Sequence, residues 1–246
     1  MGHYYQRNGQ PAHFEGPAGS ATTLREARKL GLVPSVTEVL QVIAKPQLER
    51  WKREQAILSA LTLPRLPDEP SASLTARIDA DASRQAQEAA SEGSAIHDAI
   101  EASYAAKAFP SRFMPHVGAV RAKLLEIFPK VTDWVSEQSF AHPDGFGGRV
   151  DLHSPSTGIV VDFKGKDGDF SDGKRLAYEQ HYQLGAYQYG LGLGPSPGAN
   201  IFVSRTHPGC VCAYIWEAPQ MHAGWRVFEA ALRLHKALKN YDGSWT

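Results

Sequence analysis

Residues 146–166 have the sequence FGGRVDLHSPSTGIVVDFKGK, and the expected fold depends on them. Residues 147–153 and 159–164 alternate around apolar side chains, which predicts two short strands. The Ser-Pro-Ser-Thr-Gly segment at 154–158 separates the two strands, because these residue types favour turns. The stretch therefore predicts a tight β-hairpin around which the rest of the chain is arranged.

The polar residues of this hairpin fall on one face. If the hairpin is symmetric about the bond between residues 156 and 157, Asp151 lies directly opposite Asp162, since both are equally far from that centre. Lys164 projects to the same face, whereas the apolar residues take the other face and can be buried. Two carboxylates and a lysine therefore converge on one side of an otherwise apolar hairpin. This arrangement suits a divalent metal ion and a water molecule.

The composition is that of an ordinary globular protein. The chain has 246 residues, of which 42% are hydrophobic and 21% charged, so one good-sized domain with a helical extension is expected. Lys and Arg together number 26, and so do Asp and Glu. A protein that grips long duplex DNA by charge alone is usually basic, so any contact with nucleic acid has to depend on local patches.

The sequence also bears on location and on redox cofactors. Its N-terminal residues have no apolar core, which argues against a signal peptide, and no run reaches the length of a membrane span. The cysteines, Cys210 and Cys212, are too few for an iron–sulfur cluster, which takes about four thiolates. We therefore expect a cytoplasmic protein with no membrane partner and no iron–sulfur cluster.

The first 107 residues predict an arm followed by helices. Residues 1–33 show little periodicity and predict an irregular arm on the surface. Ser-Val-Thr-Glu at 35–38 is a capping box that starts one helix, and Pro46 starts a second helix. Prolines 64, 67 and 70 mark a linker, and residues 71–107 predict one long helix or two with a break near Gly93.

The second helix carries an aromatic ring among cations. Its segment KPQLERWKR places Trp51 next to Lys52 and Arg53. An aromatic side chain between basic residues can stack on a base and contact a DNA strand. A solvated helix face with the tryptophan packed inward explains the same residues, and both interpretations stay open.

The remaining residues predict an α/β fold. A strand at 131–142 precedes the hairpin, and a charged loop at 166–174 follows it. Further helices are expected at 115–128, 175–191 and 220–240, and further strands at 200–205 and 211–216. Helices, a run of strands, and a helix before two more strands predict a mixed central β-sheet flanked by helices, with an N-terminal helical extension. We expect residues 1–130 to form the arm and helical region and 131–246 the core, together as one compact domain.

Several side chains outside the hairpin can lie near the same site. His97 and Glu101 share a helix face, although a lone helical histidine is usually a surface residue or a satisfied core residue. If the turn at 143–145 is centred on residue 144, Glu137 lies opposite Asp151, unless a bulge intervenes. Gln183 and Tyr187 also share a helix face, either as part of the site or as ordinary packing.

Four short motifs follow one another in the chain: GSAIH at 93–97, GRVD at 148–151, DFK at 162–164 and QLGAY at 183–187. Through them the chain resembles the PD-(D/E)XK nuclease superfamily, and within it the RecB-like exonuclease branch. The resemblance is close over residues 90–190, and PSVTEVL with KPQLERW is similar to the N-terminal helices of phage-encoded members. Valine precedes the first aspartate in place of proline, which is usual in this branch.

The resemblance implies a restriction-endonuclease-like core and a metal-dependent DNA exonuclease of phage or prophage recombination or DNA repair. Its substrate would be linear DNA with free ends. The chain has no P-loop, so unwinding would need a recombination or helicase partner. Two alternatives stay open: an endonuclease of the same fold that is directed by structure or sequence, and a non-catalytic nucleic-acid-binding module. An intact set of two aspartates and a lysine argues against the second.

The resemblance also assigns roles to the residues. Asp151 and Asp162 would be the principal ligands of Mg²⁺ or Mn²⁺, together with the backbone carbonyl of Phe163. His97 would add a nitrogen ligand, which Mn²⁺ accepts more readily than Mg²⁺ does. Lys164 would orient the attacking water or stabilise the developing charge.

The same resemblance gives supporting roles to three further residues. Glu137 would contact the metal ligands without binding the first metal ion itself, or would hold a second metal ion. Gln183 and Tyr187 would position the scissile strand or brace Lys164.

Overall fold

The computed structural model describes residues 3–170, 176 and 179–245. The chain forms two compact units, the sheet unit (residues 1–43 and 96–246) and the hairpin unit (residues 44–95). The boundaries of the two units lie at residues 43 and 95, and the division expected at residue 130 stays a prediction. Residues 96 onward belong to the sheet unit, so the helix that carries His97 starts in the hairpin unit and ends in the sheet unit.

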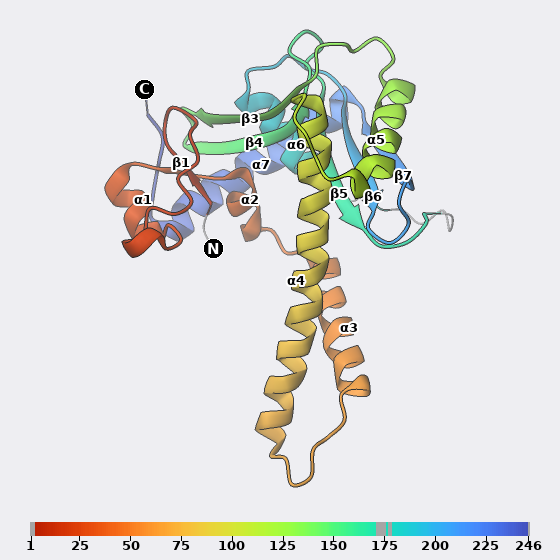
Figure 1. The fold of residues 1–246 in the computed structure, drawn as a ribbon. Helices are drawn as coiled ribbons and strands as arrows, with labels where there is room; N and C mark the ends of the chain where they lie inside the picture. The colour runs from red at the N-terminus through yellow and green to blue at the C-terminus, as the bar shows by residue number, and fades with distance from the viewer. Residues whose placement is uncertain (1–2, 171–175, 177–178, 246) are drawn as a thin grey trace. The chain divides into compact units, whose positions relative to one another are not determined.

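A five-stranded mixed sheet forms the centre of the sheet unit (Figure 1). Its order follows the chain: β3 (Val135–His142), β4 (Phe146–His153), β5 (Val160–Lys166), β6 (Gly198–Ser204) and β7 (Val211–Trp216). β5 and β6 are parallel, and every other neighbouring pair is antiparallel. A helix inserted between β5 and β6 makes the parallel pair possible, because parallel strands need a long connection. The predicted α/β fold with a mixed sheet flanked by helices is confirmed.

α5 (Met114–Ile127) and α6 (His181–Gly190) pack on this sheet. α7 (Ala218–Lys239) packs on α6 and reaches β4 through Phe228, whose ring centroid lies 4.9 Å from that of Phe146. The buried residues of α7 recur every three or four positions and include Met221, Phe228 and Leu232, so one stripe of the helix faces the core. α6 packs tightly on α7, since a Cβ at Gly185 would lie 2.6 Å from the Met221 carbonyl oxygen. Residues 175 and 177–178 of the helix expected at 175–191 lie outside the described residues, and so do residues 171–174 of the expected charged loop.

The N-terminal arm is more regular than its sequence suggested. β1 (Tyr4–Tyr5) pairs with β2 (Val33–Pro34), and between them lie a short 3₁₀ turn (Pro17–Gly19) and α1 (Leu24–Leu30). The prediction of an irregular arm was therefore wrong. The signal for α1 is a capping box, in which Thr23 and Glu26 exchange side-chain to backbone hydrogen bonds. A helix of seven residues is too short to show a clear apolar period.

The next element holds the arm against the sheet. The Ser35 hydroxyl accepts a hydrogen bond from the Glu38 N–H (3.0 Å) and starts α2 (Val36–Val39), as expected. A 3₁₀ turn (Leu40–Val42) continues it. Ser35 also bridges to Gly147 of β4, where a Cβ would lie 3.0 Å from the Tyr5 Cβ. The glycine therefore lets the arm lie close to the strand that carries Asp151.

The hairpin unit consists of α3 (Pro46–Thr62) and the first part of α4 (Ser71–Tyr104). The expected proline linker separates them. Arg77 forms an ion pair with Glu69 (2.8 Å) that ties the linker to α4. α4 is one continuous helix, so Gly93 does not break it. After α4, a 3₁₀ turn (Ser111–Phe113) precedes the helix that starts at Met114. Among the described residues, no helix combines the length and the apolar character that a membrane crossing requires.

Candidate functional site

The β4–β5 hairpin has the register that its sequence predicts. Leu152 pairs with Val161 and His153 with Val160, so Asp151 and Asp162 occupy the next opposed positions. The ladder gives way there, and the Phe163 N–H donates to Asp151 Oδ2 (2.8 Å). The two carboxylates are buried, with 9% of Asp151 and 2% of Asp162 exposed. The predicted convergence of the two aspartates is therefore confirmed.

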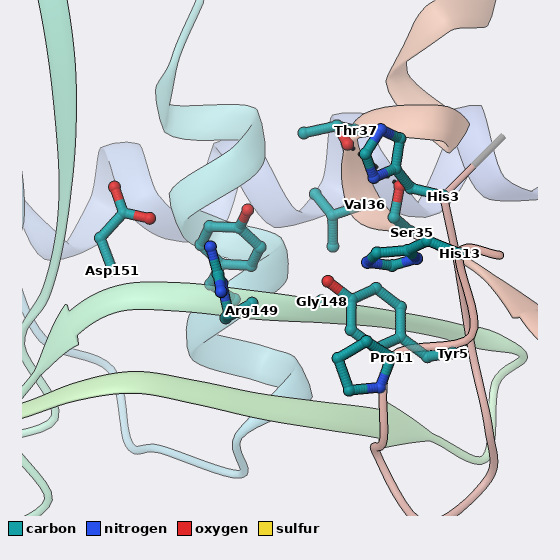
Figure 2. A pocket seen from close by; sticks show the side chains of 11 residues that line it. His3, Tyr5, Pro11, His13, Ser35, Val36, Thr37, Gly148, Arg149 and Asp151 are labelled. Atoms are coloured by element: carbon teal, nitrogen blue, oxygen red, sulfur yellow. Dashed lines mark hydrogen bonds between the residues drawn. The ribbon is translucent and has the colours of Figure 1, made fainter. Parts of the chain in front are cut away.

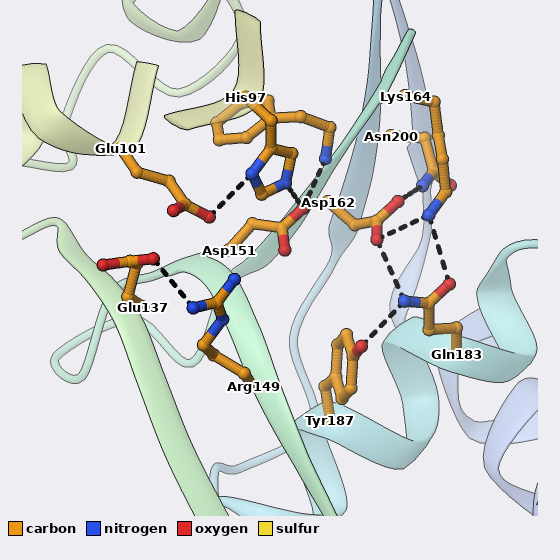
Figure 3. A network of polar contacts seen from close by, with 11 residues as sticks. His97, Glu101, Glu137, Arg149, Asp151, Asp162, Lys164, Gln183, Tyr187 and Asn200 are labelled. Atoms are coloured by element: carbon orange, nitrogen blue, oxygen red, sulfur yellow. Dashed lines mark hydrogen bonds and ion pairs between the residues drawn. The ribbon is translucent and has the colours of Figure 1, made fainter. Parts of the chain in front are cut away.

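Asp162 receives three hydrogen bonds from three different elements (Figure 3). Lys164 Nζ (2.8 Å) and Gln183 Nε2 (3.1 Å) both donate to Oδ1. Asn200 Nδ2 donates to Oδ2 (2.8 Å) from the neighbouring strand β6, and Trp216 Nε1 of β7 donates to Asn200 Oδ1 (2.8 Å). The carboxylate is therefore held at both oxygens.

Gln183 connects the lysine to the tyrosine. Its Oε1 lies 3.3 Å from Lys164 Nζ, and its Nε2 donates to the Tyr187 hydroxyl (2.7 Å). Tyr187 also belongs to the hydrophobic core, so its ring packs there while its hydroxyl contacts Gln183. Burial raises the pKa of Tyr187 well above its usual value, and the charges of Asp151 and Asp162 add to the effect. The Tyr187 hydroxyl therefore keeps its proton.

His97 lies between two carboxylates. Its Nδ1 is 2.8 Å from Glu101 Oε1, and its Nε2 is 2.8 Å from Asp151 Oδ2. Burial opposes a charged ring, but the hydrogen bonds to Asp151 and Glu101 raise the pKa of His97 to about 10. The structure therefore brings His97 to the aspartates and makes Glu101 the residue that fixes the orientation of its ring.

Glu137 lies level with Asp151 as expected, but its backbone departs from the regular strand. The β3–β4 register keeps it level with Asp151, because Gln138 pairs with Val150 on one side and Ser136 with Leu152 on the other. Glu137 itself leaves the ladder with a φ of 57°, a left-handed conformation that costs about 1–3 kcal/mol for such a residue.

The carboxylate of Glu137 contacts Arg149 and Glu101 and not the aspartates. Arg149 lies 3.0 Å from Glu137 Oε1. Burial raises the pKa of Glu101 to about 7, and a hydrogen bond with Glu137 adds to the rise. The same hydrogen bond lowers the pKa of Glu137, which therefore acts as the acceptor in this pair. Glu137 is therefore placed to support Glu101 and, through it, His97.

The remaining charges of the site are balanced. Burial opposes the charge on Lys164, but Asp162 and Asp151 raise its pKa, so it stays a cation. Burial opposes ionisation of Asp151, but the His97 hydrogen bond lowers its pKa. Burial and the neighbouring Asp151 raise the pKa of Asp162. The protonated side chains of His97 and Lys164 thus place two positive charges next to the two carboxyl groups.

The donor atoms fit a hard divalent cation. Asp151, Asp162 and the neighbouring Phe163 offer carboxylate and carbonyl oxygens, and His97 offers Nε2 once its proton has left. Ligand atoms of His97, Asp98 and Glu101 also lie within 4.8 Å of one another. A histidine ligand typically has its second nitrogen held by a carboxylate, and Glu101 does this for His97.

Sequence reasoning missed Asn200, Trp216 and the role of Arg149. Asn200 is fully buried in the apolar strand β6, and a polar residue inside such a run is a signal for a buried hydrogen bond. Its partner could not be read from the sequence, because Trp216 and Asp162 lie on separate strands.

Trp51, Lys52 and Arg53 lie on α3 in the hairpin unit. Trp51 is 38% exposed, which leaves part of its ring on the helix surface. Lys52 forms an exposed ion pair with Glu49 (3.0 Å).

Comparison with known proteins identifies no family. No family model matches the chain, and no curated protein matches it. Among solved structures, the crystal structure of SSO0001 has some likeness to the chain, with 19% identity and a TM-score of 0.29. The match covers 48% of this chain and 56% of that one, so the chain spans just over half of that structure's length. At this TM-score the likeness carries no conclusion about fold or function.

Proposed function

We propose that this chain is a metal-dependent deoxyribonuclease with a restriction-endonuclease-like core. The observation that carries the proposal is the convergence of Asp151, Asp162, Lys164 and His97 from two strands and one helix. Buried carboxylates beside a lysine are costly to maintain unless they bind a cation or act on a substrate. The order of the four sequence motifs supports the same assignment.

Each side chain has a definite part in the proposed reaction. A bound Mg²⁺ or Mn²⁺ supplies Lewis acidity and lowers the pKa of a coordinated water. Asp151, Asp162, the Phe163 carbonyl and His97 would hold the ion. Glu101 keeps the His97 ring in place, and Asn200 keeps Asp162 in place.

Lys164 is the candidate for stabilising negative charge on the reacting phosphate. Its ammonium group is anchored by Asp162 and Gln183 and stays protonated. A cation fixed in this way needs little reorganisation as charge develops, which is the property that makes electrostatic catalysis effective. Tyr187 holds Gln183, and so braces Lys164 from behind.

We infer an exonuclease that acts on linear DNA with free ends, in phage or prophage recombination or DNA repair. The RecB-like resemblance supports this, and a helicase or recombination partner would supply the unwinding. A cytoplasmic location is part of the same proposal. Degradation of linear DNA with covalently closed circles left intact is the expected result, whereas rapid nicking of the circles would favour the endonuclease alternative.

The decisive experiment compares metal binding with cleavage in two variants. Asp162→Asn removes a charged ligand, so the metal affinity measured by calorimetry and the single-turnover cleavage rate fall together. Lys164→Ala removes no ligand, so metal binding stays intact or becomes tighter, while cleavage falls by about two orders of magnitude or more. Lys123→Ala is the matched control, because its partner is the exposed Glu126. Cleavage that persists in excess chelator, or a wild-type rate for Lys164→Ala, would overturn the proposal.

A further inference from the structure

A pocket of about 310 Å³ opens beside Asp151, between the N-terminal arm and β4 (Figure 2). The arm contributes His3 and His13, the start of α2 contributes Thr37, and β4 contributes Arg149. Asp151 lies at one end of the pocket, so a ligand there would adjoin the candidate metal ligands. The proposed chemistry gives none of these four side chains a part in the reaction itself, although Arg149 also contacts Glu137.

The walls of the pocket favour an anion. The rings of His3 and His13 meet edge to face with centroids 4.8 Å apart. Burial lowers the pKa of His13, and the nearby His3 and Arg149 lower it further, which shows that three basic groups lie near one another. An anion among them would relieve this repulsion.

The donors in the pocket are available to a ligand. His13 Nδ1 accepts a hydrogen bond from the Tyr4 N–H (3.2 Å), so a neutral His13 carries its proton on Nε2, which can donate. Arg149 contacts Glu137 through one nitrogen, and 47% of its side chain is exposed. A guanidinium has further N–H groups and suits the paired oxygens of a phosphate.

We propose that this pocket binds a phosphate group of the nucleic-acid strand, next to the phosphate that is cleaved at Asp151 and Asp162. The proposal rests on the proposed function. Arg149 and Asp151 are two residues apart on one strand, so their side chains project to the same side of the sheet and can contact successive groups of one strand. The volume equals that of about ten water molecules, which leaves room for part of a sugar beside the phosphate.

Two sources of phosphate share this chemistry: a terminal phosphomonoester and an internal phosphodiester. A terminal group carries more negative charge and would make the pocket a detector of strand ends. Binding of an internal phosphate would instead position the strand in the site. Duplexes that differ only in a phosphate or a hydroxyl at their ends separate the two sources.

The first test uses the full chain, EDTA and inorganic phosphate, and so needs neither metal nor cleavage. The histidine ring signals in NMR spectra report binding. Phosphate should shift the His3 and His13 signals saturably, and this response should be lost in the variant with both His3→Gln and His13→Asn. The asparagine oxygen can still accept from the Tyr4 N–H. His222→Gln, at an exposed position on α7, is the matched control and should keep the response.

The second test measures DNA binding in EDTA. The double variant should bind DNA at least tenfold more weakly than the control. A loss confined to phosphate-ended duplexes supports the terminal source, and an equal loss for hydroxyl-ended duplexes supports the internal source. His3→Gln alone changes an exposed side chain and should show part of the loss in a protein that folds normally. The pocket assignment would be overturned if phosphate did not shift the histidine signals, or if the double variant bound DNA as tightly as the control does. Phosphate binding in a protein that cleaves no DNA would instead overturn the proposed function alone.

Discussion

Replacing Asn200 with alanine should be among the most damaging single changes to the stability of the sheet unit. Asn200 is fully buried, donates to Asp162 Oδ2 and accepts from Trp216 Nε1, each over 2.8 Å. The truncation leaves a carboxylate oxygen and an indole N–H without these partners inside the protein. A lost hydrogen bond to a charged group costs about 1.5–3 kcal/mol and a buried unsatisfied donor about 1–3 kcal/mol, so the expected loss of unfolding free energy is about 3–5 kcal/mol.

A double-mutant cycle separates the two hydrogen bonds. Trp216→Phe removes the indole N–H and leaves Asn200 Oδ1 without this donor, at an expected cost of about 1–2 kcal/mol. In the double variant the unsatisfied indole N–H no longer exists. The combined loss should therefore be smaller than the sum of the single losses by about 1 kcal/mol.

Urea denaturation of the metal-free protein measures these losses, with equal slopes required for the comparison. Asn8→Ala serves as the control, since Asn8 lies in an exposed turn and accepts only a local hydrogen bond from the Gln10 N–H. Its loss should stay below about 1 kcal/mol. If Asn200→Ala costs no more than this control, or if the cycle is additive, the Trp216–Asn200–Asp162 chain does not hold the carboxylate as inferred.

Three further predictions address other parts of the chain. The folded protein binds the His97 proton more tightly than the unfolded chain does, because the pKa of His97 is raised to about 10. This stabilisation is complete below pH 6.5 and is lost as the pH rises to about 10. The Tm of the metal-free protein should therefore fall over that window, and it should fall less steeply in the His97→Gln variant. Gly148→Ala would place a Cβ 2.9 Å from a tyrosine ring and should cost about 1–3 kcal/mol in urea denaturation, whereas Gly118→Ala, which has open space, should cost nothing. Trp51→Ala with Lys52→Ala should weaken DNA binding and lower its salt dependence by about one unit, and an unchanged slope would favour a plain solvated helix face.

The register of the sheet was predictable because strand alternation and turn position constrain each other. A one-residue slip would move Val150 and Leu152 from the core to solvent, so the hydrophobic pattern leaves one pairing. With the register known, Asp151 and Asp162 follow as opposed residues. Local pattern was therefore enough to locate the two carboxylates.

The parts that escaped prediction depend on non-local contacts or on single backbone angles. Nothing in the sequence indicates that Glu137 adopts a φ of 57° and turns toward Glu101. Asn200 contacts Asp162 and Trp216 only after three strands have assembled. The arm is similar in kind, since His3 and His13 become neighbours only through a turn and the β1–β2 pair.

Arg149 links the two proposed sites. It lines the phosphate pocket, and it also holds Glu137, whose hydrogen bond with Glu101 supports the residue that orients His97. A phosphate that draws Arg149 toward the pocket would loosen its hold on Glu137, and the negative charge left there would favour the proton on Glu101. Glu101 would then contact the His97 ring less as an anion and more as a neutral acceptor. A ligand in the phosphate pocket would in this way be connected to His97 through the contacts of Arg149, Glu137 and Glu101.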